Sequence, residues 1–340
     1  MTGHSRRRIA LSILLLFGSK LAYGQTPPNP KRDKALQRIQ VCIRRNEASS
    51  RGCKHQHRDV AFLVEVYKGG DKSVLPVLFQ FTYLTDFYDE ALLADRDGFL
   101  TAMAQLPEKQ QLYVADGIAG GWTFRLGVDR FTALRASLAS VPEDSNTKAV
   151  ANLSLRIVEA QNAALFLNYF PPQTFSGAAA QFRIRWYSTF LYRLGEKPLF
   201  PPSTGDESTF RFTHVGAFTY PRALTLTFSS DGSGQLKVNT PREVTDPTKA
   251  GRLRSVSAAE VSEFLDRIDR AHFWDLPAEE SQPQGLDGAE WILEGVHNGR
   301  YHIVVRWCPG LPQRSAEAAA FAESARFLFQ LAGEQYKGGC

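Results

Sequence analysis

Hydrophobic and polar positions follow two different rhythms along this chain. Up to about residue 194, apolar residues recur every three or four positions, as on one face of an α-helix; from about residue 224 they alternate with polar residues, as in a half-buried β-strand. Prolines and polar residues interrupt both rhythms at 195–208. The pattern predicts a helical domain at 25–196, a linker at 197–208 and an α+β domain at 209–340.

The helical domain is predicted to consist of short helices separated by glycine or proline. Their apolar residues fall at 36–43, 60–67, 74–84, 99–106, 150–167 and 182–194. Such a succession is typical of stacked helical hairpins, although no clean repeat of about 40 residues is present.

The best-specified element lies in the α+β domain, where two strand-like runs flank Asn298-Gly299. Asn-Gly tolerates positive φ at both central turn positions, so it predicts a two-residue type I′ hairpin. On one face of that hairpin, four pairs of residues lie opposite each other: Ile292 with Val305, Val296 with Tyr301, Glu290 with Trp307 and Glu294 with Ile303. On the other face the pairs are Trp291 with Arg306, Leu293 with Val304 and Gly295 with His302. We expect the first face, which is nearly apolar, to be the core.

Two more strands and two helices complete the predicted layer. Alternation predicts a strand at 224–228 and its return at 236–238. Ser257 and Glu260 have the spacing of a capping box at the start of one helix, and Ser315 begins the last helix. The order strand–strand–helix–strand–strand–helix predicts an antiparallel sheet with both helices on its apolar side.

Two stretches resemble known proteins. Residues 62–78, Phe-Leu-Val-Glu-Val-Tyr-Lys-Gly-Gly-Asp-Lys-Ser-Val-Leu-Pro-Val-Leu, resemble a HEAT-like helical hairpin. Residues 255–335 combine the capped helix with Phe273-Trp-Asp-Leu-Pro, Gly285-Leu-Asp-Gly and Trp307-Cys-Pro, and resemble the C-terminal part of uncharacterised bacterial exported proteins. The second resemblance supports the α+β fold and implies no catalytic residues.

The first 24 residues are typical of a secretory signal peptide. Three arginines at 6–8 precede an apolar run at 9–17, and Ala22-Tyr23-Gly24 predicts a cut before Gln25. Cleavage would remove four cations and no acid, which lowers the formal net charge from +5 to +1, so the basic composition gives no support for nucleic-acid binding. No later apolar run reaches about 18 residues. We therefore expect a periplasmic or secreted bacterial protein with no transmembrane segment after cleavage.

Four cysteines follow the predicted cut, at positions 42, 53, 308 and 340. An even count in an oxidising compartment suggests disulfides, for which three complete pairings exist. Cys42 with Cys53 is the preferred pair. The pairing of Cys308 with Cys340 stays open, because a helix between them would carry the chain about 27 Å away.

Cys42, Cys53, His55 and His57 offer thiol and imidazole ligands of the kind that Zn²⁺ takes. Their spacing is not that of a common zinc finger, and an oxidised Cys42–Cys53 pair would remove two of the four ligands. We therefore favour a disulfide beside two exposed histidines, with no metal. No other cofactor motif is present, so none is predicted.

Residues 31–58 are strongly basic, with nine Lys or Arg against only Asp33 and Glu47. The simpler interpretation is a solvated basic helix. The alternative is contact with an anionic surface such as a phosphate-rich envelope polymer.

Asp287, Glu290 and Glu294 are the candidate catalytic residues, because paired carboxylates in an apolar setting can act as acid and base. The competing interpretation places Glu290 at the end of the sheet and pairs Glu294 with an arginine such as Arg254 or Arg326. We favour the latter, because no nucleophile motif, metal cluster or glycine-rich phosphate loop accompanies the carboxylates.

Trp291 opposite Arg306, with His302 close by, could present an aromatic and cationic face to a ligand, or could serve cross-strand packing. The sequence as a whole favours an exported, non-catalytic binding or scaffold protein whose partner is an envelope component or another protein. The alternative is a hydrolase that uses the carboxylates in an interdomain cleft. Carboxylates that converge in an open pocket would favour the enzyme, and carboxylates bonded to arginine would favour binding.

Overall fold

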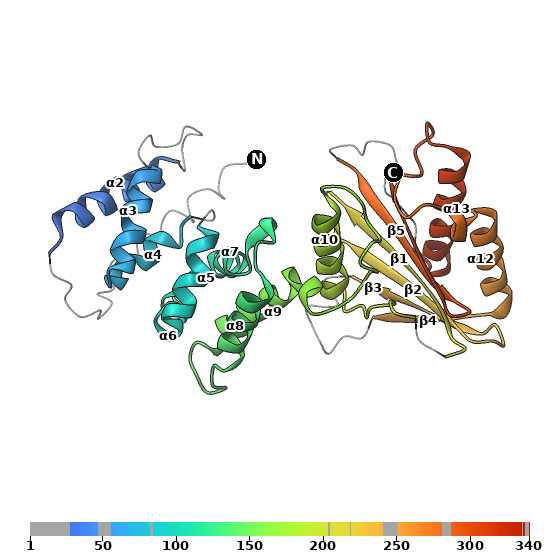
Figure 1. Ribbon diagram of the computed structural model, residues 1–340, viewed down its shortest axis with the longest axis horizontal. Coiled ribbons are helices and arrows are strands. Elements are labelled where there is room, and N and C mark those ends of the chain that lie inside the picture. Colours follow the sequence, from blue (N-terminus) through green and yellow to red (C-terminus); the bar gives the residue numbers. More distant parts are fainter. Residues whose placement is uncertain are drawn as a thin grey trace, which may run out of the picture. The chain divides into compact units, whose positions relative to one another are not determined.

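The computed structural model describes residues 28–46, 56–81, 84–202, 205–217, 219–240, 251–280 and 287–334, together with Tyr336 and Cys340. The chain divides into two compact units. The first contains residues 1–117 and 142–150, and the second contains residues 118–141 and 151–340. Helices precede an antiparallel sheet with packed helices, so the predicted fold class is confirmed (Figure 1).

The first unit is helical throughout its described part. Its elements are α2 (Pro30–Asn46), α3 (Gln56–Lys68), η1 (Lys72–Val74), α4 (Leu75–Leu78), α5 (Thr85–Ala94), α6 (Arg96–Ala104) and α7 (Glu108–Ile118). Tyr88 is fully buried among them, and its hydroxyl donates to the carbonyls of Leu78 and Phe81, both at 2.8 Å. The buried hydroxyl of Tyr88 on α5 is therefore satisfied by the end of α4 and the residues that follow it.

The second unit contains further helices and all of the strands. Its helical elements are η2 (Gly121–Thr123), α8 (Val128–Ala139), most of α9 (Lys148–Gln161), η3 (Ala163–Leu165), α10 (Ala180–Arg193), α12 (Ala258–Arg270), η4 (Phe273–Asp275) and α13 (Ala316–Leu331). The predicted N-terminal caps are confirmed: Ser257 and Glu260 form a capping box, and the Ser315 hydroxyl accepts from the amide of Ala318.

Six strands form one antiparallel sheet in the order β4-β3-β2-β1-β5-β6. They are β1 (Ser208–Gly216), β2 (Arg222–Phe228), β3 (Gly234–Asn239), β4 (Arg252–Val256), β5 (Ala289–His297) and β6 (Arg300–Trp307). The sequence predicted β2, β3, β5 and β6 but neither β1 nor β4. The missed strand β1 is central, because it pairs with both β2 and β5.

The β5–β6 hairpin has the predicted turn and the predicted register. Asn298 and Gly299 have φ of 51° and 72°, as a type I′ turn requires. Every predicted cross-strand pair is present, from Glu290 opposite Trp307 to Val296 opposite Tyr301.

Both faces of the sheet are covered, which corrects the prediction that α12 and α13 pack on the face of Ile292. Those two helices pack instead on the opposite face, which carries Trp291, Leu293 and Val304. The face of Ile292 packs against α10 and the residues that precede it. Figure 1 shows α10 on one side of the sheet and α12 and α13 on the other.

The segment predicted as a linker, 197–208, lies inside the second unit and not at its boundary. Its upstream neighbour α10 packs on the sheet, and the hydroxyl of Tyr169 donates to the carbonyl of Glu196 at 2.8 Å. The division between the units therefore does not coincide with the change from helical to strand periodicity.

The structure contains a disulfide between Cys308 and Cys340, whose pairing the sequence left open. Cys42 is also disulfide-bonded. Its predicted partner, Cys53, lies outside the described residues.

Candidate functional site

A cavity of about 240 Å³ in the second unit brings carboxylates and aromatic rings together. Its lining consists of Phe182, Trp186, Val215, Gly216, Ala217, Asp287, Gly288, Ala289, Glu290 and Trp307. Two of the three predicted catalytic carboxylates are therefore in one cavity, and the third is not.

The hairpin register places one carboxylate and one indole side by side at the rim of the sheet. Glu290 on β5 lies opposite Trp307 on β6 and opposite Val215 on β1. The side chains of directly opposed residues stand on the same face of a sheet, so all three turn toward α10.

Helix α10 supplies the other aromatic wall. Phe182 and Trp186 are four residues apart and therefore lie on the same side of the helix. Their rings stack with centroids 5.6 Å apart and an interplanar angle of 21°. Phe182 is 47% exposed, which is unusual for a phenylalanine that also lines a cavity.

Gly288 permits the close approach of the chain to Trp307. Its φ is 141°, and a Cβ atom at this position would lie 2.8 Å from Nε1 of Trp307 and 2.6 Å from Sγ of Cys308. Its carbonyl accepts from the amide of Ala217 at 2.8 Å and thereby joins the loop after β1 to the start of β5. A side chain at position 288 would displace the indole that forms this wall.

The two carboxylates of the cavity differ in environment. Asp287 is exposed, whereas Glu290 is half-buried. Burial raises the pKa of Glu290 above its ordinary 4.5, and the Tyr187 hydroxyl and the Arg183 guanidinium oppose that increase only in part. Glu290 therefore keeps its proton to higher pH than an exposed glutamate does.

Glu294 is sequestered in the core. Its Oε2 accepts from Nε and Nη2 of Arg211 at 2.8 and 2.6 Å, and its Oε1 accepts from the hydroxyl of Tyr301 at 3.1 Å. Arg211 and Glu294 are both fully buried. The predicted arginine partner is thus real, but it is Arg211 and neither Arg254 nor Arg326.

Trp291, Arg306 and His302 do not form an open ligand face. Trp291 is fully buried, and its ring meets that of Tyr336 edge-on at 4.8 Å. Arg306 is buried and donates to the carbonyl of Pro277 at 2.9 Å, while Nε2 of His302 lies 3.0 Å from the carbonyl of Leu276. These contacts favour the packing interpretation, because helices cover this face of the sheet.

The candidate zinc ligands are only partly described. Cys42 is disulfide-bonded and therefore has no thiolate to offer, and His57 is exposed. Cys53 and His55 lie outside the described residues. Within the described ranges no group of three His, Cys, Asp or Glu side chains has the geometry to hold a metal ion.

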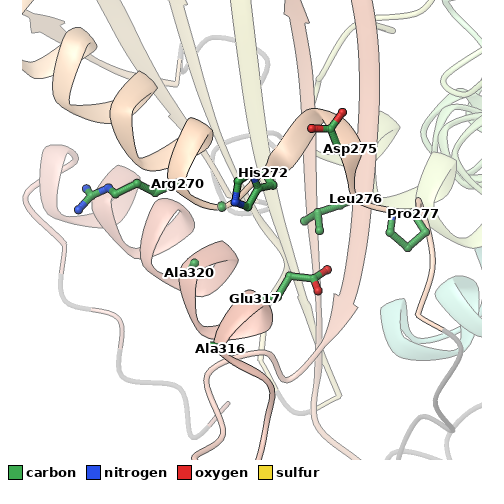
Figure 2. A pocket seen from close by; sticks show the side chains of 9 residues that line it. Arg270, His272, Asp275, Leu276, Pro277, Ala316, Glu317 and Ala320 are labelled. Atoms are coloured by element: carbon green, nitrogen blue, oxygen red, sulfur yellow. The ribbon is translucent and has the colours of Figure 1, made fainter.

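A second cavity, of about 590 Å³, lies between the end of α12, η4 and the first turns of α13. Figure 2 shows its carboxylates, Asp275 and Glu317, on different elements, with Arg270 and His272 contributed from the end of α12 and the residues after it. The charges are mixed in sign, and no Phe, Tyr or Trp ring lines the cavity among the described residues. It therefore offers carboxylates without the aromatic walls of the first cavity.

Sequence reasoning identified Asp287 and Glu290 but missed Phe182 and Trp186. Both aromatic residues belong to a helical stripe that reads as core-facing, and nothing local distinguishes a ring that covers a sheet from one that lines a cavity beside it. The exposure of Phe182 is a property of the folded chain and not of its sequence pattern.

No model of a known protein family matches this chain, and no curated protein matches it either. The resemblance of residues 255–335 to bacterial exported proteins therefore stays a prediction. None of the helices in the described part of the chain combines the length and the apolar character needed to cross a membrane.

Proposed function

We propose that the chain is a binding protein and that the cavity beside α10 takes a small, positively charged organic group. The observation that carries this proposal is the convergence of Asp287 and Glu290 with the rings of Phe182, Trp186 and Trp307 in one cavity. Carboxylates attract a cation, and the negative face of an aromatic ring attracts it as well. An ammonium group interacts favourably with both the carboxylates and the aromatic rings of the cavity.

The size of the cavity restricts the ligand. At about 240 Å³ it is smaller than the ~300–1,000 Å³ typical of sites for drug-sized molecules. It fits a single small cation, or the charged end of a larger partner such as the amine of a lysine side chain. The second possibility agrees with a scaffold role toward another protein.

The charge balance at the cavity favours a cationic ligand over an anionic one. No Lys, Arg or His lines it among the described residues. Arg183, whose charge partly opposes the rise in the pKa of Glu290, is itself ion-paired with Glu279. The field inside the cavity is therefore negative once Glu290 is ionised.

The experiment is titration with choline, followed through the fluorescence of Trp186 and Trp307, with its neutral carbon isostere as the comparison. We expect choline to bind and the isostere to bind much more weakly. Glu290→Gln should weaken choline binding by about tenfold, and Asp287→Asn, whose carboxylate is exposed, by about threefold.

The second cavity provides matched controls. Asp275→Asn and Glu317→Gln also remove one carboxylate each from a cavity of the same unit, but from one without aromatic walls. These variants should leave choline affinity unchanged. Equal weakening by all four substitutions would refute the assignment and indicate nonspecific attraction to an acidic surface.

A hydrolase is the second candidate, because one feature favours it specifically. Glycosidases use one carboxyl group with a raised pKa as the acid and a second carboxylate as the base or nucleophile, and Glu290 and Asp287 could divide these roles. Incubation with a panel of aryl glycosides tests this candidate. Turnover that disappears in both Glu290→Gln and Asp287→Asn would establish it and replace the binding proposal.

We also propose that the protein is exported. The predicted leader and the two disulfide-bonded sites at Cys42 and Cys308 support this, since disulfides persist in oxidising compartments. Mass spectrometry of the protein from its native cells tests the proposal. A mature N-terminus at Gln25 is the expected result, and an intact N-terminus on most of the protein would contradict it.

A further inference from the structure

Four of the described cations of the basic segment singled out in the sequence line a groove in the first unit. A cavity of about 570 Å³ is lined by Lys31, Lys34, Arg38, Arg58, Asp59 and Phe62. Helix α2 contributes the first three and α3 the others. The cavity thus has four cations against one carboxylate.

The spacing along α2 directs its cations to one side. Lys31, Lys34 and Arg38 follow one another at three and four positions, so they form a row on the helix surface. The row spans roughly 10 Å at ~1.5 Å per residue. The buried side of the same helix carries Ala35 and Ile39, which are 0% and 1% exposed.

The one carboxylate of the groove is already committed. Asp59 is buried, and both of its oxygens accept from Arg38, one of them from Nε at 2.7 Å and the other from Nη2. This two-point contact fixes the guanidinium of Arg38 at the groove while its side chain stays 47% exposed. Arg38 is therefore held in place before any ligand arrives.

The remaining cations are not compensated by acids within the described part of the chain. Lys31, Lys34 and Arg58 are exposed and make no salt bridge there. The nearby acids Asp33 and Asp71 both pair with Arg32, which does not line the groove. Uncompensated like charges repel one another, and an anion placed among them would relieve that repulsion.

We infer that this groove binds a ligand that carries at least two phosphate groups. A phosphate group concentrates up to two negative charges and several acceptor oxygens, and arginine forks and lysine ammonium groups are its usual partners. A single carboxylate would neutralise only one of the three uncompensated charges. Phe62, half-buried on α3, offers an apolar contact for the ligand body between its charges.

The test is isothermal titration of the full chain with inorganic tripolyphosphate and, separately, with orthophosphate. We expect tripolyphosphate to bind clearly at low ionic strength and at least tenfold more weakly at high salt, because the cations are exposed and screened. Orthophosphate should bind much more weakly. Lys34→Gln and Arg58→Gln should each reduce tripolyphosphate affinity about fivefold.

Two further variants separate charge from structure. Lys34→Arg keeps the cation and should retain the affinity that Lys34→Gln loses. Lys109→Gln removes an exposed cation of α7, in the same unit but outside the groove, and should have no effect. Arg38 is left unchanged, because its removal would take a two-point ion pair from the buried Asp59.

Several outcomes would overturn the inference. Absence of tripolyphosphate binding at low ionic strength would do so directly. Equal affinity for a polyglutamate peptide would show a general preference for acidic chains. Binding to phosphatidylglycerol vesicles without binding to tripolyphosphate would assign the groove to a membrane surface. None of these results bears on choline binding in the other unit, so the two proposals are tested separately.

Discussion

Replacement of the buried Arg211–Glu294 pair should show how much of the sheet depends on one guanidinium. Arg211 donates through Nε and Nη2 to Glu294 and through Nη1 to the carbonyl of Lys197 at 2.6 Å. A second carboxylate, that of Glu196, lies 3.7 Å from Nη1. No donor of Arg211 can be rehydrated when one of these partners is removed, because its side chain is fully buried.

Removal of one partner from a buried ion pair leaves an uncompensated charge in the core, which costs about 3–5 kcal/mol. We expect the loss of stability in Glu294→Met to lie at the low end of this range, because the carboxylate of Glu196 still attracts Arg211. Arg211→Met should fall at the high end, because it leaves two buried carboxylates with no cation between them. The double variant should be more stable than the sum of the single losses predicts, by at least about 2 kcal/mol.

Urea unfolding followed by tryptophan fluorescence is the appropriate assay. The five tryptophans are Trp122, Trp186, Trp274, Trp291 and Trp307. All of them lie in the second unit, so their emission follows the unit that contains the ion pair. The helical first unit contributes no tryptophan signal to the transition.

Acidification should distinguish the two single variants. Without Arg211, the pKa of Glu294 rises above its already raised value, because only the hydrogen bond from the Tyr301 hydroxyl then opposes the effect of burial. The loss of stability in Arg211→Met is therefore largest above that raised pKa and shrinks as the pH falls toward the ordinary 4.5. Glu294→Met has no carboxyl group at this position and should lack that recovery.

The exposed pair of Glu263 and Arg267 on α12 supplies the control, since its atoms lie 2.7 Å apart in a partly solvated i,i+4 arrangement. A double-mutant cycle on it should give no more than about 0.5 kcal/mol. A cost of less than about 1 kcal/mol for Glu294→Met, or equal coupling energies in the two cycles, would contradict a dominant role for the buried pair.

Two further predictions concern a disulfide and a helix cap in the second unit. Replacement of Cys308 and Cys340 by serine removes a crosslink over a sequence separation of 32. The loss of this loop constraint should lower the free energy of unfolding by about 3–4 kcal/mol. The urea midpoint of the variant should then match that of the reduced wild type, and an unchanged midpoint would contradict the prediction. Ser257→Ala removes the hydroxyl of the capping box and should lower stability by about 1 kcal/mol at neutral pH. Hydrogen bonds from the Ser257 amide, from Arg254 and from the Ser257 hydroxyl lower the pKa of Glu260 to about 2. The part of the loss that comes from the bond between the hydroxyl and the Glu260 carboxylate is therefore present above pH 4.5 and disappears as the pH falls to about 2. The difference between the thermal melts of wild type and variant should shrink over that range.

The hairpin was predictable because its information is local. Asn298-Gly299 selects one turn type, and the turn then fixes which residue of β5 faces which residue of β6. The helix caps were predictable for the same reason, since Ser257 and Glu260 are three residues apart. The register of the hairpin and the start of each capped helix thus depend on residues that are close together in the sequence.

The assignment of helices to faces of the sheet was not predictable in this way. An antiparallel strand with one face in water shows a clear contrast between its two faces, but β5 is buried on both. The face of Ile292 is nearly apolar and the face of Trp291 is mixed, so the sequence pattern favoured the face of Ile292 for the packing of α12 and α13. That choice was wrong. Trp291 packs in the core because α13 covers it, and α13 is a distant part of the sequence.

The central strand β1 was missed for a related reason. Phe210 and Phe212 alternate with Arg211 and Thr213 as a strand requires, but Arg211 and Thr213 are residue types expected to face solvent. Both are buried, at 0% and 1% exposure. The partner that makes the burial of Arg211 tolerable, Glu294, is 83 residues away, and no local pattern records it.

The same network explains why a stretch with the composition of a linker is bonded to the sheet. Glu196 is buried and accepts from Thr225 on β2 at 3.0 Å and from Asn239 on β3 at 2.6 Å, while the carbonyl of Lys197 accepts from Arg211. The chain at this point is therefore bonded to three strands through polar groups that sequence composition assigns to solvent.

Hydrogen exchange can test this role of the network. In the wild type, the amides of Leu199 and Phe200, which follow Pro198, should exchange slowly for a segment rich in proline, because opening it breaks the bond from Arg211 to the Lys197 carbonyl. Arg211→Met should accelerate exchange there more than in β6, which makes no bond to the guanidinium in the described structure. Uniform acceleration across the whole sheet would mean that Arg211 stabilises the unit globally and does not pin this segment.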